Sequence, residues 1–286
     1  LLNQVLKILM KDYPECFVEI YCSGSVYGTF PGAVWNGGRA VFGITGIKDI
    51  RAILKLYNDR GVPVRFTWTN SLLEEKHIYD TYCNLIMKEA DNGLNQVLVN
   101  RPVLEEYIRR QYPGFKLISS TTKRITGLDG LLEELNKDYF LVVLDYDLNH
   151  NEEVLSAIGK QADKVEILVN EICYPGCPKR SEHYRQQSQM QLEYDIDAAF
   201  PCPNKTRERK FEECKERPSF ISREQIREYA DRGFVNFKIV GRGMPMDFVK
   251  ESYLYYLVKD DSRAFIRNKM ESTLNQFAQA MRKRKA

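Results

Sequence analysis

The sequence contains few histidines and no long apolar run. Only three histidines and two tryptophans occur among its 286 residues. No stretch approaches the roughly 20 consecutive apolar residues that a membrane-spanning helix needs. The apolar start "LLNQVLKILM" carries Lys7 and lacks a signal-peptide cleavage pattern, so it predicts a helix rather than a leader. We therefore expect a protein with no membrane partner.

Common hydrolase and nucleotide-binding motifs are absent as well. The sequence has no HExxH and no GxSxG, and no GxGxxG follows the first predicted strand. A cysteine–histidine hydrolase would have to use His183, ahead of His77 and His150. His77 lies within a predicted helix and is interpreted as structural. The motifs alone therefore give no sign of nucleophilic catalysis.

Neither sign of charge dominates the chain. The 42 basic and 39 acidic residues leave a net charge of +3 and are interspersed, which gives little support for nucleic-acid binding. The basic tail "MRKRKA" is interpreted as a solvated end. Seven cysteines, an odd number, in a chain of this size indicate free or metal-bound thiols in a reducing compartment. A cytoplasmic location is the expectation.

Short β-rich runs alternate with amphipathic helical runs, which predicts a parallel sheet wrapped by helices. Eight strands are predicted, at 17–22, 64–69, 95–99, 115–119, 139–144, 164–169, 219–221 and 235–240. Eight such units are the number in a closed TIM-like (β/α)8 barrel. We therefore predict an α/β protein with one barrel domain over residues 1–286 and an outer helix at about 262–281. An open doubly wound sheet is the alternative.

Polar side chains gather where the predicted strands end. The active sites of such barrels lie at the carboxyl ends of the strands. The polar residues at these positions are Cys22, Asn70, Asn100, Ser119, Ser120, Thr121, Asp145, Asp147, Asn170, Glu171 and Arg242, with Lys238 directed inward from the last strand. Each residue alone is typical of a cap or a turn. Together they predict a shared pocket.

A glycine-rich segment, "VYGTFPGAVWNGGRAVFG" at 26–43, follows the first predicted strand. Its glycines permit close backbone approach to a ligand, and Arg39 offers a fork for a carboxylate or phosphate. A structural loop with an exposed arginine is the alternative. The predicted substrate-binding residues are Asn36, Arg39, Asn70, Asn100, Asn170, Lys238 and Arg242. We expect a small anionic substrate or co-substrate, with RNA and peptide substrates left open.

The stretch "LVNEICYPGCPKRSEHY" at 168–184 opens the longest predicted loop, about 170–218. This loop carries Cys173, Cys177, His183, Cys202 and Cys214. The Pro-Gly turn between the first two cysteines can aim both sulfurs at one point. Thiolates suit iron–sulfur clusters or zinc. The predicted ligands are Cys173, Cys177 and Cys202. A cluster could use these three and leave one iron open to substrate, or take a fourth ligand from Cys22 or Cys214. A structural zinc would take its fourth ligand from His183 or Cys214.

Several segments together resemble a known family. "VNEICYPGCPKRSEHY", "CPNKTRERKFEECKERPSFISREQI", "FKIVGRG" and the "WNGGR" loop resemble the collagenase-like peptidase family U32, most closely its short, single-barrel bacterial branch. The resemblance covers nearly the whole chain and implies a TIM-like barrel. Some of its relatives resemble iron–sulfur proteins linked to oxygen-independent hydroxylation of a quinone precursor or of RNA bases. The resemblance implies cluster positions at Cys173, Cys177 and Cys202, with Cys214 extra and Cys22 a loose match.

Three functions are therefore considered. The first is an iron–sulfur enzyme, expected to hold a 4Fe-4S cluster, that catalyses an oxygen-independent hydroxylation or a related redox reaction. The second is a collagenase-like peptidase, and the third is a non-catalytic barrel with a structural zinc. His183 and Glu171 are the candidate catalytic residues of an enzyme. The sequence gives no indication of the oligomeric state.

Overall fold

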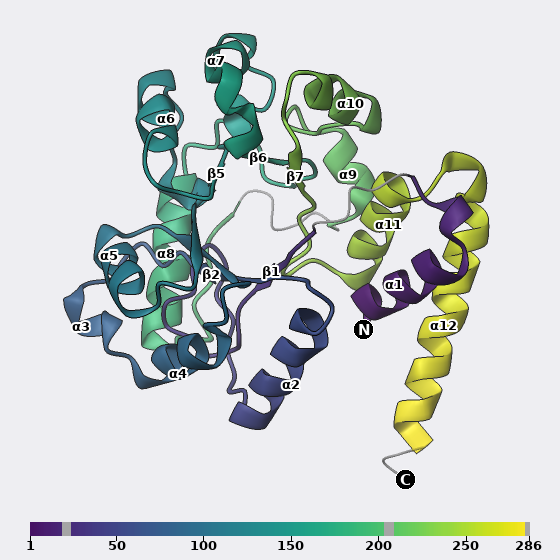
Figure 1. Cartoon of the computed structure of the whole chain (residues 1–286), viewed down its shortest axis with the longest axis horizontal. Helices are drawn as coiled ribbons and strands as arrows, with labels where there is room; N and C mark the ends of the chain where they lie inside the picture. Colours follow the sequence, from purple (N-terminus) through teal and green to yellow (C-terminus); the bar gives the residue numbers. More distant parts are fainter. Residues whose placement is uncertain (19–23, 203–208, 284–286) are drawn as a thin grey trace.

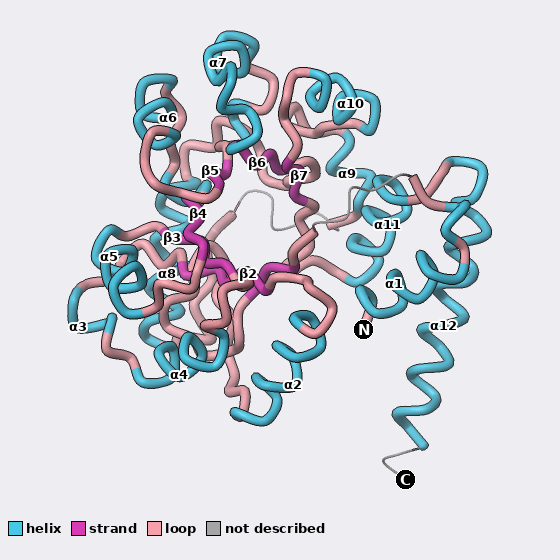
Figure 2. Tube along the Cα trace, viewed as in Figure 1, coloured by secondary structure: helices cyan, strands magenta, loops and turns pink. Residues whose placement is uncertain are grey.

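A single curled sheet lies at the centre of the computed structural model, which describes residues 1–18, 24–202 and 209–283. Seven parallel strands follow one another in chain order, from β1 to β7. Figure 2 shows them around a central space, with helices outside them. The parallel α/β fold is confirmed and is consistent with a TIM-like barrel. The predicted count of eight strands is wrong for the described residues.

The strands are short and fall close to the predicted positions in most cases. They are β1 (Val26–Gly28), β2 (Val64–Trp68), β3 (Gln96–Val99), β4 (Lys116–Ser119), β5 (Leu141–Val143), β6 (Val165–Leu168) and β7 (Asn236–Lys238).

Helices connect the strands and extend beyond the last one. Those before β6 are α1 (Leu2–Asp12), α2 (Ile47–Asn58), α3 (Glu75–Ile78), α4 (Thr81–Ala90), α5 (Pro102–Gln111), α6 (Leu128–Leu135) and α7 (Glu152–Ile158). Those after β6 are α8 (Arg180–Glu193), α9 (Phe211–Lys215), α10 (Arg223–Asp231), α11 (Met246–Leu257) and α12 (Arg263–Lys283). The predicted outer helix at the C-terminus corresponds to α12.

The first predicted strand, 17–22, is not a barrel strand where it is described. Phe17 forms an isolated antiparallel bridge with Val258, and residues 19–23, including Cys22, lie outside the described part. The described edge strand β1 lies inside the segment predicted as a glycine-rich loop, and Val26 pairs with Val64. Aromatic and β-branched content predicted the earlier segment, but pairing partners decide which segment joins the sheet.

The seventh predicted strand, 219–221, is not a strand either. β6 pairs directly with β7, so nothing lies between them in the sheet. The Ile221 N–H donates a backbone hydrogen bond to the carbonyl of Val169, the residue that follows β6 (3.0 Å). Among the described residues this bond is not extended into a strand ladder. Pro218 precedes the segment and has no backbone N–H to donate to a ladder.

The predicted cysteine-bearing loop, 170–218, is largely helical. It contains α8, which has 14 residues, and the short helix α9. The α8 sequence, "RSEHYRQQSQMQLE", is polar nearly all round, so it carries no apolar period that would mark it as a helix. The sequence pattern therefore did not predict α8, whose position depends on contacts with distant segments.

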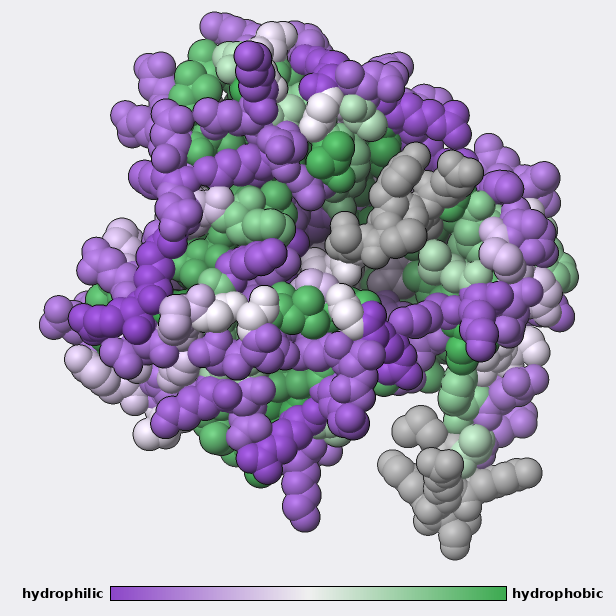
Figure 3. All heavy atoms as spheres, in the orientation of Figure 1, coloured by the Kyte–Doolittle hydropathy of each residue, from purple (hydrophilic) through white to green (hydrophobic). Residues whose placement is uncertain are grey.

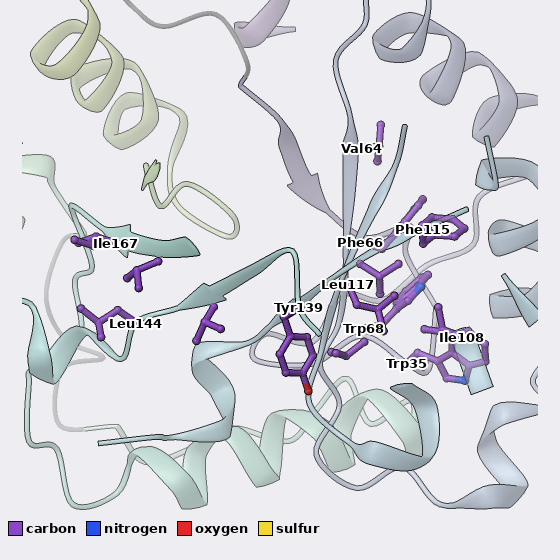
Figure 4. Close-up of a cluster of buried hydrophobic side chains, with 14 of the residues drawn as sticks. Trp35, Val64, Phe66, Trp68, Ile108, Phe115, Leu117, Tyr139, Leu144 and Ile167 are labelled. Carbon is purple, nitrogen blue, oxygen red and sulfur yellow. The ribbon is translucent and has the colours of Figure 1, made fainter. Parts of the chain in front are cut away.

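The hydrophobic core has an outer and an inner layer, because successive strand side chains point to opposite faces of the sheet. The outer layer packs strand residues such as Phe66 and Trp68 against helices, and Figure 4 shows these side chains beside Trp35 and Ile108. The smaller inner layer consists of Leu98, Ile118, Leu141, Val143, Tyr146, Leu168 and Val240. The inner layer leaves part of the barrel interior to polar groups.

A charged network fills that part of the interior. Arg65 pairs with Glu166 and also donates from Nε to Gln96 Oε1 at 2.9 Å. Lys238 Nζ lies 3.5 Å from Glu166 Oε1. All four side chains are buried. Burial lowers the pKa of Lys238 to about 8, although Glu166 acts in the opposite direction.

The edges of the curled sheet meet through side chains. β1 and β7 form no ladder with each other among the described residues, yet the Tyr27 hydroxyl donates to the Ile239 carbonyl at 2.6 Å. Lys238 Nζ lies 4.2 Å from the centre of the Tyr27 ring. These contacts bring the first and last strands together around the interior.

A second hydrophobic cluster lies beside the barrel. It joins residues of α1, α11 and α12, and α12 extends away from the sheet in Figure 1. On the face shown in Figure 3, hydrophilic residues cover most of the rim. No described helix combines the length and apolar content that a membrane crossing requires.

Candidate functional site

A pocket of about 550 Å³ lies at the carboxyl ends of the strands. Its walls come from the segments that follow β1, β4, β6 and β7 and from one face of α8. The predicted residues that line it are Arg39, Ser120, Thr121, Glu171, Cys173, His183, Cys202, Lys238 and Arg242. The pocket occupies the position at which active sites of parallel barrels occur.

The pocket lining is strongly basic. Among the described residues it contains the six basic side chains Arg39, Arg180, Arg209, Arg217, Lys238 and Arg242 but only the two acidic side chains Glu171 and Glu213. Low-polarity walls strengthen the field of such charges, because they are screened less than on an open surface. An anionic ligand matches this lining.

Arg242 is fixed by the end of β2 and the glycine-rich segment. Its Nη1 donates to Asn36 Oδ1 (2.6 Å) and Thr67 Oγ1 (2.7 Å), and its Nη2 donates to the Gly37 carbonyl (2.9 Å). Burial, together with the positive charge of Arg39, lowers the pKa of Arg242 to about 10. Arg242 remains charged at neutral pH and is held rigidly at the pocket wall.

The close approach at Gly37 explains why a glycine stands in this segment. A Cβ at this position would lie 2.3 Å from the carbonyl carbon and oxygen of Thr69. The glycine therefore allows the segment to lie directly against the end of β2. The sequence predicted close approach to a ligand, but at Gly37 the neighbour is the protein's own backbone.

Arg39 and Glu171 form an ion pair in the pocket lining. Arg39 Nη2 lies 3.8 Å from Glu171 Oε1, and Arg39 also donates to the Arg242 carbonyl. Glu171 Oε1 accepts hydrogen bonds from the backbone N–H groups of Ile172 (2.9 Å) and Cys173 (3.1 Å). The carboxylate is thereby oriented from its own turn.

Two of the three predicted metal-ligating cysteines lie in the pocket. Cys173 and Cys202 line it, whereas Cys177 does not, and none of the described cysteines forms a disulfide. Burial, together with the negative charge of Glu171, raises the pKa of the Cys173 thiol to about 11. The thiol of Cys173 is therefore protonated at neutral pH in the metal-free protein.

Cys214, a candidate fourth ligand, is buried outside the pocket lining. It lies on α9, is fully buried and donates from Sγ to the Asn170 carbonyl at 3.3 Å. Burial raises the pKa of its thiol to about 12. In this arrangement Cys214 packs beneath the pocket wall rather than lining it. Cys22, the other candidate, lies outside the described residues.

His183 stacks on an aromatic neighbour. Its ring lies parallel to the Phe200 ring, with an interplanar angle of 3° and centres 4.4 Å apart. Burial lowers the pKa of His183, and so do the positive charges of Arg39 and Arg209. Within the described chain no hydrogen bond joins His183 to a cysteine, so a cysteine–histidine pair is not formed here.

Helix α8 supplies pocket residues that the sequence interpretation missed. Arg180, Tyr184 and Gln187 line the pocket beside His183, because positions three or four apart share one face of a helix. The helix is tied to the glycine-rich segment: Gln187 Oε1 accepts from the Ala40 N–H at 2.9 Å. These residues are spaced three or four positions apart. If α8 had been predicted as a helix, this spacing would have placed them on the face that carries His183.

The four predicted asparagines lie outside the pocket lining. Asn36, Asn70 and Asn170 are fully buried. Asn70 Nδ2 donates to the Val34 (2.9 Å) and Ser188 (3.0 Å) carbonyls. Asn170 Oδ1 accepts from the Val240 N–H at 2.6 Å. Asn100 is half-buried and donates to Thr122 Oγ1 at 2.9 Å.

Asn36, Asn70 and Asn170 bond to backbone groups that would otherwise be unpaired, whereas Asn100 bonds to a side-chain hydroxyl. Their polar atoms therefore hold loops in place. A direct contact of these asparagines with a substrate remains a sequence prediction.

The predicted metal site is incomplete in this arrangement. Within residues 1–18, 24–202 and 209–283, no group of three or more histidine, cysteine, aspartate or glutamate side chains is close enough to hold a metal ion. Cys173 and Cys202 have the thiolate chemistry that iron–sulfur clusters and zinc require. The described side chains thus offer two thiols in one pocket rather than a full ligand set.

Fold and site together define a barrel-like parallel α/β protein with a basic, cysteine-bearing pocket at its strand ends. No family model matches the chain. A protein of Methanocaldococcus jannaschii named uncharacterized protease MJ1657 is 26% identical over 266 residues, which cover 90% of this chain and 76% of that protein.

A solved structure supports the fold. The structure of the U32 peptidase Mk0906 aligns with a TM-score of 0.51 at 18% identity, over 78% of this chain and 86% of that one. The resemblance to the U32 peptidases that the sequence indicated is therefore confirmed.

Proposed function

We propose that this protein is an enzyme of the U32 peptidase type that acts on an anionic substrate in the pocket at the strand ends. The observation that carries the proposal is the excess of basic side chains around two thiols in one pocket. Arg39, Lys238 and Arg242 would hold the negative group of the substrate. Glu171 and His183 line the same pocket and are the candidate proton-transfer residues.

We further propose that Cys173, Cys177 and Cys202 hold an iron–sulfur cluster. The support is the chemistry of the ligands and the position of two of them in the pocket. A cluster there would supply electron transfer or a Lewis-acidic iron for an oxygen-independent hydroxylation or a related redox reaction. Free thiols suit a reducing compartment, so we place the protein in the cytoplasm.

Metal analysis of anaerobically purified protein tests the cluster. We expect iron and sulfide, an absorption band in the visible spectrum, and loss of iron in Cys173→Ala and Cys202→Ala. Cys16→Ala is the matched control, because Cys16 lies on the short turn after α1, and it should keep its iron. Colourless, iron-free protein, with Cys173→Ala as stable as the parent, would overturn the cluster.

The same measurement decides a third function. Stoichiometric zinc, with unfolding on chelation, would indicate a barrel with a structural zinc instead. Folded protein free of zinc would exclude this alternative.

The second candidate function is peptidase activity, which rests on the names of the two similar proteins. Among the residues that the structure describes, no hydrogen bond joins His183 to a cysteine, and its ring stacks on Phe200. If the protein is a peptidase, hydrolysis of gelatin should fall in His183→Ala or Glu171→Gln. Hydrolysis that is insensitive to both substitutions and to chelators would indicate a contaminating protease.

A further inference from the structure

Arg180 has hydrogen-bond donors that the described protein leaves unused. The residue is 2% exposed and lines the pocket. Its Nη2 donates to Asp145 Oδ1 (2.7 Å) and to Asp147 Oδ2 (2.8 Å). Its Nε and Nη1 have no hydrogen-bond partner among the described residues. Buried donors without an acceptor cost free energy, so an acceptor in the pocket would stabilise this arrangement.

The guanidinium of Arg180 is held in place without a ligand. The two aspartates fix one of its nitrogens, and its central carbon lies 3.9 Å from the centre of the Tyr146 ring. Arg124 Nη1 contacts the same two carboxylates at 3.1 Å. Two arginines therefore balance two aspartates, and the acidic pair leaves no excess negative charge to repel an anion.

A second polar atom without a partner among the described residues belongs to Thr121, which also lines the pocket. This atom is the side-chain Oγ1, which is buried. Thr121 follows β4 and Asp145 follows β5, which are neighbouring strands. Arg180 is also the first residue of the 14-residue helix α8, whose positive dipole end favours an anion.

Two other pocket arginines differ in this respect. Arg242 uses both of its terminal nitrogens on Asn36, Thr67 and Gly37, and Arg39 is engaged by Glu171 and the Arg242 carbonyl. Unlike these two, Arg180 keeps two buried donors, Nε and Nη1, without a partner among the described residues.

We propose that Arg180 and Thr121 form an oxyanion subsite that accepts a phosphate or carboxylate group of the substrate. The inference deepens the proposed function by assigning where an anionic group binds. It does not depend on an iron–sulfur cluster. A phosphate and a carboxylate present the same acceptor chemistry to these donors, and binding measurements separate them.

Calorimetric titration of the full chain with inorganic phosphate, and separately with acetate, at constant ionic strength in chloride tests the subsite. We expect one site, weakened about tenfold by Arg180→Lys, which keeps the charge but loses Nε and the planar arrangement of donors. Arg124→Lys is the matched control, because Arg124 binds the same aspartates but does not line the pocket. It should change the affinity less than about threefold.

Two further measurements protect the test against a folding defect. In protein labelled with 15N-arginine, the Nε–H resonance that is absent from Arg180→Lys should shift on adding phosphate but not chloride. If Arg180→Lys does not fold, as judged by circular dichroism, Thr121→Val should still weaken binding.

Absence of binding of both oxyanions, equal loss in the two lysine variants, an unmoved Nε resonance, or unchanged binding in Thr121→Val would each overturn the subsite. Iron-free protein that binds phosphate would retain the subsite while the cluster proposal fails. Iron-bearing protein that binds neither oxyanion would do the reverse.

Discussion

At the scale of single residues, Asn36 joins three parts of the site. Its Nδ2 donates to the Arg39 carbonyl (2.7 Å) and to Gln191 Oε1 (3.1 Å), and its Oδ1 accepts from Thr67 Oγ1 (2.9 Å) and from Arg242. The residue is fully buried, so water cannot replace these bonds. The amide thus positions a pocket arginine although it does not line the pocket itself.

Asn36→Ala should lower the free energy of unfolding by about 3 kcal/mol, because it removes one acceptor of the charged Arg242 and the bonds to Arg39 and Gln191. Asn100→Ala is the control, since Asn100 is half-buried and bonds to one hydroxyl, and about 1 kcal/mol is expected there. Urea unfolding of both variants measures the difference. Equal losses in the two variants would show that the hydrogen bonds of Asn36 stabilise the fold no more than the single half-buried bond of Asn100.

The ionisation of Glu134 should make the free energy of unfolding depend on pH. Burial acts to raise its pKa, but hydrogen bonds from Lys123 (2.6 Å), Lys137 (2.6 Å) and Ser119 (2.5 Å) hold the pKa at about 2, below its ordinary value of 4.5. A carboxyl group with a lowered pKa stabilises the fold above its unfolded pKa. That contribution is lost as the pH falls toward the folded pKa.

Glu134→Gln should therefore destabilise the protein by up to roughly 3 kcal/mol at neutral pH. The gap to the parent should narrow between pH 4.5 and about pH 2. Glu133→Gln, at the exposed neighbouring position, should show no such narrowing. Thermal unfolding midpoints across this range provide the measurement, and a constant gap would contradict the assignment.

At the scale of elements, α8 is held against the barrel by polar contacts. Gln191 Oε1 accepts from the Val41 N–H (2.7 Å) and its Nε2 donates to the Val41 carbonyl (3.2 Å), while Asn70 donates to the Ser188 carbonyl (3.0 Å). Such bonds need exact partners, unlike an apolar face that packs against many surfaces. The position of α8, and with it Arg180 and His183 in the pocket, depends on a few side chains.

Gln191→Ala should loosen this attachment. Hydrogen exchange should become faster in α8 and in residues 40–43, with a loss of about 2 kcal/mol in the free energy of unfolding. Gln189→Ala is the control on the same helix, since Gln189 is exposed and bonds to Glu193. Equal exchange in both variants would mean that α8 is held by something other than Gln191.

At the scale of the whole molecule, the sheet is curled far enough for its two edge strands to meet through Tyr27. The Tyr27 hydroxyl donates to the Ile239 carbonyl at 2.6 Å, and burial raises the pKa of this hydroxyl, so it remains a donor at neutral pH. One side chain thus takes over part of the role that a strand ladder plays in a fully closed barrel.

Tyr27→Phe should lower the free energy of unfolding by about 1 kcal/mol and speed hydrogen exchange at β1 and β7. Tyr107→Phe removes a hydroxyl bond to Asn84 in the outer helical layer and serves as the control. It should leave exchange at the two edge strands unchanged. Identical exchange patterns in the two variants would show that Tyr27 does not join the edges.

The sequence by itself determined the alternating parallel fold and most strand positions. The strand β5 is continuously apolar, and β2, β3 and β6 are rich in apolar and β-branched residues around single polar positions, which is a local signal. The polar residues at strand ends also predicted much of the pocket, because parallel strands bring their carboxyl ends to one edge. Glu171, Lys238 and Arg242 were found in this way, whereas Arg39 was predicted from the glycine-rich segment.

Only the tertiary structure decided which segment forms the edge strand, that a polar stretch of 170–218 is the helix α8, and that Arg180 lines the pocket. The physical reason is that these features rest on partners distant in sequence. Val26 joins the sheet through Val64, and α8 is held by Val41 and Asn70. Arg180 faces the pocket because Asp145 and Asp147 anchor it there. A pattern of neighbouring residues in the sequence does not predict contacts between residues that lie far apart along the chain.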